Sequence, residues 1–120
     1  LAPELDDRIQ EIHFGEWEGR RWADIDRAES NTWAADYLRA APPGGESYEQ
    51  MLARVDAFLA DLGASFERIA IVTHAGPLRA ILVRCLGLAP EAAWKFDVGY
   101  GRLTRLAQRG GEWRLEVLNA

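Results

Sequence analysis

The residue that best combines reactive chemistry with a favourable place in the sequence is His74. It follows an apolar, β-branched run, residues 69–73, and precedes Ala75 and Gly76 at an expected helix start. In open α/β sheets, ligands bind beyond the carboxyl ends of the strands, and the free N–H groups of a helix start favour a phosphate. Small residues at 75 and 76 let the backbone approach such an anion closely. The pattern predicts an anion site, although a structural histidine at a strand end explains His74 equally well.

A second group of reactive side chains lies in the segment Glu11–Gly19. It contains three carboxylates, Glu11, Glu16 and Glu18, and one histidine, His13. A carboxyl group among aromatic and apolar neighbours can have a raised pKa and serve as a general acid. Residue types alone do not choose among the three carboxylates, and each also fits a solvated surface position. His13 is more typical of a half-buried or surface histidine than of a catalyst.

Helices are expected to position these two groups. Apolar residues recur at three- and four-residue spacings in several stretches, and Ser47 with Gln50 forms a capping box at the start of one of them. A Pro- and Gly-rich break, residues 41–45, precedes this helix. The expected helices cover residues 22–38, 47–62, 78–86 and 90–94.

Three segments are expected to be strands. Residues 69–73 have the continuous apolar pattern of a strand that is covered on both faces in a parallel sheet. Residues 101–107 and 113–118 predict two strands joined by a hairpin turn over 109–112. Helices that alternate with a buried strand, followed by a terminal hairpin, predict an α/β fold with a mixed sheet.

The composition excludes several classes of function. The chain has 120 residues, which suits one domain, and its net charge of −5 disfavours binding to nucleic acid. The apolar runs are too short for a membrane span, so we expect no membrane partner and a cytoplasmic location. One cysteine, Cys85, and two histidines make a metal site improbable.

Three segments together resemble motifs of the histidine phosphatase superfamily, of the phosphoglycerate-mutase-like type. Glu11–Arg20 resembles the family's acid-bearing segment, Pro43–Ser47 its loop and helix start, and Val72–Arg79 its second-histidine motif. Their order and separation match the family over essentially the whole chain. The residues of Phe14–Arg20, together with Trp94 and the expected strand start at Tyr100-Gly101, resemble the α-ribazole-phosphate phosphatase branch most.

This resemblance implies a three-layer α/β fold with a mixed sheet and phosphoryl transfer through a phosphohistidine. By position, Glu11 would be the catalytic acid and base, and His74 the second histidine that binds the phosphate. The backbone N–H groups of Ala75 and Gly76 would face the phosphate as well. The resemblance implies no cofactor and no metal.

The resemblance also implies a small phosphorylated metabolite as substrate, with Phe14 and Trp22 lining its pocket. In the intact protein we expect this to be α-ribazole 5′-phosphate of cobalamin synthesis. A broader phosphatase or mutase that acts on sugar or glycerate phosphates is the alternative.

The family's Arg-His-Gly motif, which carries the nucleophilic histidine, does not occur in these 120 residues. We therefore expect residues 1–120 to be the C-terminal portion of a histidine phosphatase domain, inactive by itself. The missing nucleophile strand would pair beside residues 69–73. A non-catalytic binding module of the same fold is the rival from another class, and a homodimer is the assembly to test.

Overall fold

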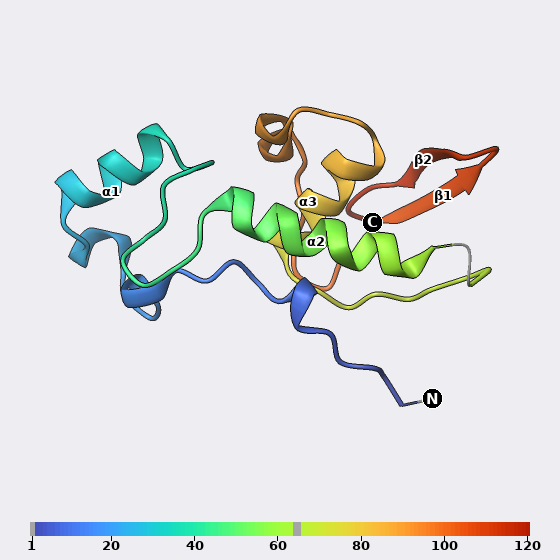
Figure 1. Ribbon diagram of the computed structural model, residues 1–120, viewed down its shortest axis with the longest axis horizontal. Helices are drawn as coiled ribbons and strands as arrows, with labels where there is room; N and C mark the ends of the chain where they lie inside the picture. The colour runs from blue at the N-terminus through green and yellow to red at the C-terminus, as the bar shows by residue number, and fades with distance from the viewer. Residues whose placement is uncertain (1, 64–65) are drawn as a thin grey trace.

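The structure is a computed structural model that describes residues 2–63 and 66–120, and within them helices predominate (Figure 1). The three α-helices are α1 (Arg27–Ala35), α2 (Tyr48–Leu62) and α3 (Ala75–Cys85). Short 3-10 helices precede α1 and follow α3. These are η1 (Asp7–Ile9), η2 (Gly15–Trp17), η3 (Trp22–Asp24) and η4 (Pro90–Lys95).

The helix predicted over residues 22–38 is interrupted, and this part of the prediction was wrong. η3 ends at Asp24, and α1 begins after Asp26, whose side chain accepts a hydrogen bond from Glu29 N–H at 3.1 Å. An aspartate at this position satisfies a free N–H group of the first turn. It therefore starts a new helix instead of continuing the previous one.

The capping box predicted at the start of α2 is confirmed. Gln50 N–H donates to Ser47 Oγ at 3.2 Å, and Ser47 N–H donates to Gln50 Oε1 at 2.8 Å. These two bonds satisfy backbone donors that a helix start leaves free. The predicted helix that follows His74 is confirmed as α3, which begins at Ala75, and Pro77 lies in its first turn.

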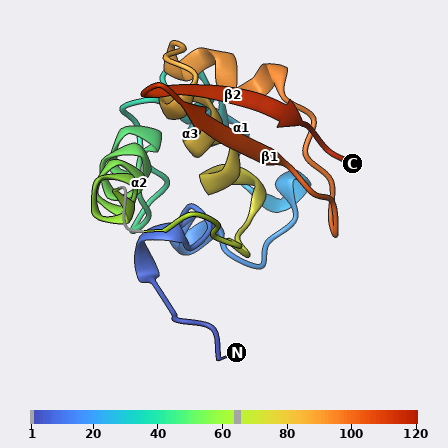
Figure 2. The same ribbon diagram turned by 90° about the vertical axis from the view of Figure 1, so that its right-hand side faces the viewer.

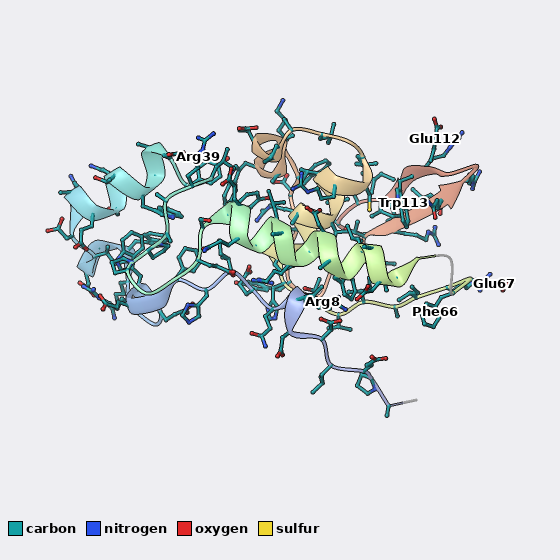
Figure 3. All side chains as sticks on the ribbon, in the orientation of Figure 1. Arg8, Arg39, Phe66, Glu67, Glu112 and Trp113 are labelled. Atoms are coloured by element: carbon teal, nitrogen blue, oxygen red, sulfur yellow. The ribbon has the colours of Figure 1, made fainter. Side chains whose placement is uncertain are left out.

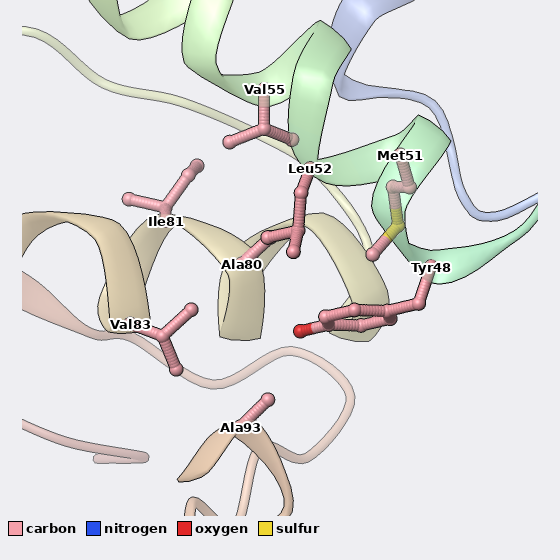
Figure 4. Packing of buried hydrophobic residues seen from close by; sticks show 8 residues of the cluster. All are labelled: Tyr48, Met51, Leu52, Val55, Ala80, Ile81, Val83 and Ala93. Atoms are coloured by element: carbon pink, nitrogen blue, oxygen red, sulfur yellow. The ribbon is translucent and has the colours of Figure 1, made fainter. Parts of the chain in front are cut away.

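The core lies where α3 packs between α2 and η4 (Figure 4). Side chains of α2 face those of α3 because their apolar positions recur once per helical turn. Met51 and Val55 of α2, with Ala80 and Val83 of α3, have no exposed surface. The cluster consists of Tyr48, Met51, Leu52, Val55, Ala80, Ile81, Val83 and Ala93.

The predicted terminal hairpin forms from β1 (Arg105–Arg109) and β2 (Glu112–Val117), which pair antiparallel, but its first strand begins at Arg105 and not at residue 101. Gly110 and Gly111 both have positive φ, at 58° and 80°, as two-residue hairpin turns require. The two strands lie side by side in Figure 2, and Leu106 of β1 packs against the core. None of the helices in the described residues is long and apolar enough to cross a membrane.

The run 69–73 is not a strand in this structure, which corrects the prediction of a strand buried in a parallel sheet. In the described part of the chain, the sheet is formed by β1 and β2 alone. Ile69 is 45% exposed and Val72 is 93% exposed. A strand is defined by the ladder that it shares with a neighbour, and the nucleophile strand expected as that neighbour is not among these 120 residues. The apolar side chains of residues 69–73 therefore stay largely exposed.

Candidate active site

The structure brings Glu11 of the acid segment to Gly76 at the start of α3. Gly76 N–H donates to Glu11 Oε2 at 3.3 Å, although the two residues are 65 positions apart. Glu11 Oε1 accepts a second hydrogen bond from Ile12 N–H at 2.8 Å. The carboxylate thus lies at a helix N-terminus, where the positive end of the helix dipole favours negative charge.

His74 occupies the N-cap position of α3 with an extended backbone. Its carbonyl accepts the hydrogen bond of Leu78 N–H at 3.0 Å, but its side chain does not cap the helix. The residue is exposed, whereas Ala75 and Gly76 are half-buried. The imidazole is therefore accessible to a ligand at the helix start.

Glycine at position 76 leaves the space that the Glu11 carboxylate occupies. A Cβ atom at this position would lie 2.1 Å from Glu11 Oε1 and 3.4 Å from Met51 Sδ. An unbonded carbon and oxygen do not approach so closely. The absence of a side chain at Gly76 is what allows the carboxylate to reach the helix backbone.

The structure separates the three carboxylates that residue types left equivalent. Glu11 is half-buried against α3, whereas Glu16 and Glu18 are exposed. Glu18 accepts a hydrogen bond from Phe14 N–H at 2.8 Å and so supports the local turn. His13 is exposed, in agreement with its interpretation as a surface histidine.

The Pro- and Gly-rich loop before α2 packs directly on the acid segment, which sequence reasoning did not predict. Glu16 N–H donates to Pro43 O at 2.8 Å, and Glu46 N–H donates to His13 O at 2.9 Å. Gly15 has a φ of +58°, and a Cβ atom there would lie 2.2 Å from Pro43 O. The glycines of both segments are the signal that such a close backbone crossing leaves in a sequence.

Two more contacts hold the residues just before the acid segment. Arg8, labelled in Figure 3, donates to Asp61 Oδ2 of α2 at 2.5 Å. Thr73 Oγ1 donates to Ile9 O at 2.6 Å. These residues are therefore fixed between α2 and the stretch that leads into α3.

The predicted pocket residues Phe14 and Trp22 belong to an aromatic cluster beside the acid segment. Their rings meet edge to face at 6.0 Å, and Trp22 stacks on Trp33 with centroids 5.8 Å apart. Trp17 is the buried member, and Trp22 is 59% exposed. A hollow of about 180 Å³ is lined by Phe14, Trp17 and Trp22, among others.

Comparison with known proteins connects these features to one family. The histidine phosphatase superfamily (branch 1) model matches residues 1–120. The chain is 33% identical over 125 residues to adenosylcobalamin/alpha-ribazole phosphatase of Escherichia coli. This alignment covers 100% of the chain and 60% of that protein. It is 30% identical over 143 residues to glucosyl-3-phosphoglycerate phosphatase of Mycobacterium tuberculosis, with 100% and 63% covered.

Solved structures give the same picture. The alpha-ribazole phosphatase from Shigella flexneri superposes with a TM-score of 0.92 at 30% identity, covering 100% of this chain and 62% of that one. A mycobacterial glucosyl-3-phosphoglycerate phosphatase with inorganic phosphate gives a TM-score of 0.84 at 29% identity, with 100% and 66% covered. These matches confirm the predicted α/β, phosphoglycerate-mutase-like fold. The chain spans about three fifths of the length of the curated relatives it matches. Because the family model matches all 120 residues, the chain belongs to the histidine phosphatase superfamily, branch 1.

Proposed function

We propose that the protein containing this chain hydrolyses phosphomonoesters through a phosphohistidine intermediate. The observation that carries this proposal is the hydrogen bond from Gly76 N–H to the Glu11 carboxylate, next to the exposed His74. It joins a proton-transfer group to a helix start that suits a phosphate. The phosphatase relatives and the family motifs of this chain support the same reading.

Each of these residues has a distinct role in the proposed reaction. Protonated Glu11 gives its proton to the leaving oxygen while the P–O bond breaks and a nucleophilic histidine forms a P–N bond. That histidine belongs to the family's Arg-His-Gly motif, which lies outside these 120 residues. Glu11 carboxylate then takes a proton from water, which attacks phosphorus and releases the histidine. His74, with the N–H groups of Ala75 and Gly76, stabilises the charge of the phosphoryl oxygens.

The bond between Gly76 and Glu11 fits an exchange with a phosphate. At 3.3 Å it is longer than the usual N–H···O bond of about 2.9–3.0 Å. A phosphate oxygen that takes this N–H group therefore displaces a weak partner. The displaced carboxyl group stays beside the phosphate, where the leaving oxygen needs a proton.

For the substrate, we propose α-ribazole 5′-phosphate of cobalamin synthesis, because relatives and solved structures that cover the whole chain bear this function in their names. Phe14 and Trp22 are suited to contact its planar base, since aromatic rings stack on one another. A sugar-phosphate or glycerate-phosphate monoester is the second candidate, which the glucosyl-3-phosphoglycerate phosphatase relatives favour. A cytoplasmic location suits a charged metabolite that membranes retain. The homodimer stays a prediction.

The test uses the full-length protein that contains this chain, with α-ribazole 5′-phosphate and glucosyl-3-phosphoglycerate compared by kcat/KM. Glu11→Gln removes the acid with a nearly isosteric group, so turnover should fall by about 10²- to 10⁴-fold with the melting temperature unchanged. Glu16→Gln changes an exposed carboxylate of the same segment and should leave turnover unchanged. Full turnover in Glu11→Gln would remove Glu11 from the mechanism. Equal kcat/KM values for the two substrates would refute the α-ribazole assignment alone.

A further inference from the structure

Arg54 of α2 binds three main-chain carbonyl groups, two just before the acid segment and one at its first residue, Glu11. Its Nη1 donates to Arg8 O and to Gln10 O, both at 2.8 Å. Its Nη2 donates to Glu11 O at 3.2 Å. One side chain therefore serves as hydrogen-bond donor for most of the backbone that leads into the proposed acid.

Glu46 orients the Arg54 guanidinium and extends its reach. The two side chains form a bidentate pair, with Nη2 to Oε1 at 2.5 Å and Nε to Oε2 at 3.2 Å. Glu46 Oε1 also accepts His13 N–H at 3.0 Å. Arg54 is 21% exposed and Glu46 19%, so water competes little for these bonds. Together the two residues fix the backbone from Arg8 to His13.

The charge state of Glu46 agrees with this arrangement. Burial raises the pKa of its carboxyl group, but the hydrogen bonds from Arg54 and from His13 N–H lower it by more. The net pKa lies below the usual value of 4.5, so Glu46 is ionised near neutral pH. The ion pair with Arg54 is therefore intact near neutral pH.

Such a tie is needed because the acid segment has no strand ladder in the described part of the chain. Carbonyl groups outside helices and sheets need other donors. Arginine offers five N–H donors in a rigid fork, whereas lysine offers a compact point charge on a flexible stem. The guanidinium thus fixes the position of the Glu11 main chain, and thereby how far the Glu11 carboxylate extends towards α3.

We propose that Arg54, oriented by Glu46, is the positioning residue that sets the location of the Glu11 carboxyl group for proton transfer. This inference rests on the proposed function of Glu11. Among the residues that the structure describes, the hydrogen bonds of Arg54 go to main-chain carbonyl groups and to Glu46, so we infer that it acts through Glu11 and not on the substrate. A misplaced acid harms substrates whose leaving oxygen needs a proton more than substrates whose leaving group departs without one.

The experiment compares two phosphomonoesters in the full-length enzyme, p-nitrophenyl phosphate with its good leaving group and β-glycerophosphate with its poor one. Arg54→Lys should lower kcat/KM for β-glycerophosphate by about 10- to 100-fold, as a misplacement of about 1 Å does. For p-nitrophenyl phosphate the loss of kcat/KM, which excludes the later hydrolysis of the phosphohistidine, should be below about threefold. The ratio of the two rates does not depend on how much of the enzyme is folded. Arg84→Lys is the matched control. Arg84 pairs with Asp56, Nε to Oδ1 at 2.8 Å, and not with the acid segment, so this variant should leave the ratio unchanged.

A second comparison separates the inference from the proposed function. If Arg54 acts through Glu11, Arg54→Lys added to Glu11→Gln should change kcat by less than about twofold. A Glu11→Gln variant that lowers kcat/KM equally for both substrates would refute the acid role of Glu11 itself, because kcat/KM reports the steps up to departure of the leaving group. The positioning role alone would be overturned by a different pair of results. In that case Glu11→Gln would slow β-glycerophosphate more than p-nitrophenyl phosphate, whereas Arg54→Lys would slow both substrates equally. Glu46→Gln keeps an acceptor for His13 N–H and should shift the ratio in the same direction as Arg54→Lys, but less.

Discussion

Replacing Gly76 by alanine tests whether the carboxylate of Glu11 works from the place where the structure puts it. The added Cβ atom would lie 2.1 Å from Glu11 Oε1 and 3.2 Å from Glu11 Cδ. Unbonded carbon and oxygen atoms rest at about 3.3 Å or more. The carboxylate oxygen must therefore retreat by about 1 Å, and because it is the end of a flexible side chain, it can do so.

The two effects of this change differ greatly in size. A displacement of about 1 Å at a reacting group costs about 10²-fold in rate, equivalent to about 2.7 kcal/mol of activation free energy. The free energy of unfolding should change by less than about 1 kcal/mol, because alanine favours a helix over glycine by about that amount and offsets the new contact. Gly76→Ala should thus slow the enzyme and leave it folded.

The assay measures kcat of the full-length enzyme together with its unfolding in urea. Gly99→Ala is the matched control, since its Cβ atom would meet another flexible side chain, Arg102 Cγ at 3.2 Å, and not Glu11. In a Glu11→Gln background, Gly76→Ala should cause no additional loss of kcat. Wild-type kcat in Gly76→Ala would refute the reasoning, because the carboxylate would then act from somewhere else.

Two predictions concern stability. Tyr48 is 5% exposed, and within the described residues its hydroxyl group has no hydrogen-bond partner. Tyr48→Phe should therefore leave the free energy of unfolding unchanged or raise it by about 1 kcal/mol. A decrease of more than about 1 kcal/mol in urea unfolding would show that the hydroxyl group has a partner. The pKa of Glu46 is lower in the folded state than its usual 4.5, so its stabilisation is present above that pH and is lost as the pH falls through the folded-state value. Melting temperatures between pH 6 and pH 3 should therefore fall more steeply for the wild type than for Glu46→Gln, and parallel curves would contradict this assignment.

Local features of this protein could be predicted from the sequence because neighbouring residues determine them. The capping box of Ser47 and Gln50 satisfies donors within one helical turn. The turn of Gly110 and Gly111 requires a backbone conformation that glycine adopts at little cost. The motifs that contain Glu11 and His74 were recognisable for a related reason, since their residues lie close together along the chain.

Tertiary structure decided everything that depends on residues far apart. It placed Glu11, and neither Glu16 nor Glu18, against Gly76, 65 positions away. It also gave Arg54 its carbonyl partners, which lie 43 to 46 positions before it and leave no periodic pattern. The run 69–73 shows the opposite limit: its β-branched residues indicate a strand, but a strand forms only when a second strand supplies the other half of the hydrogen bonds.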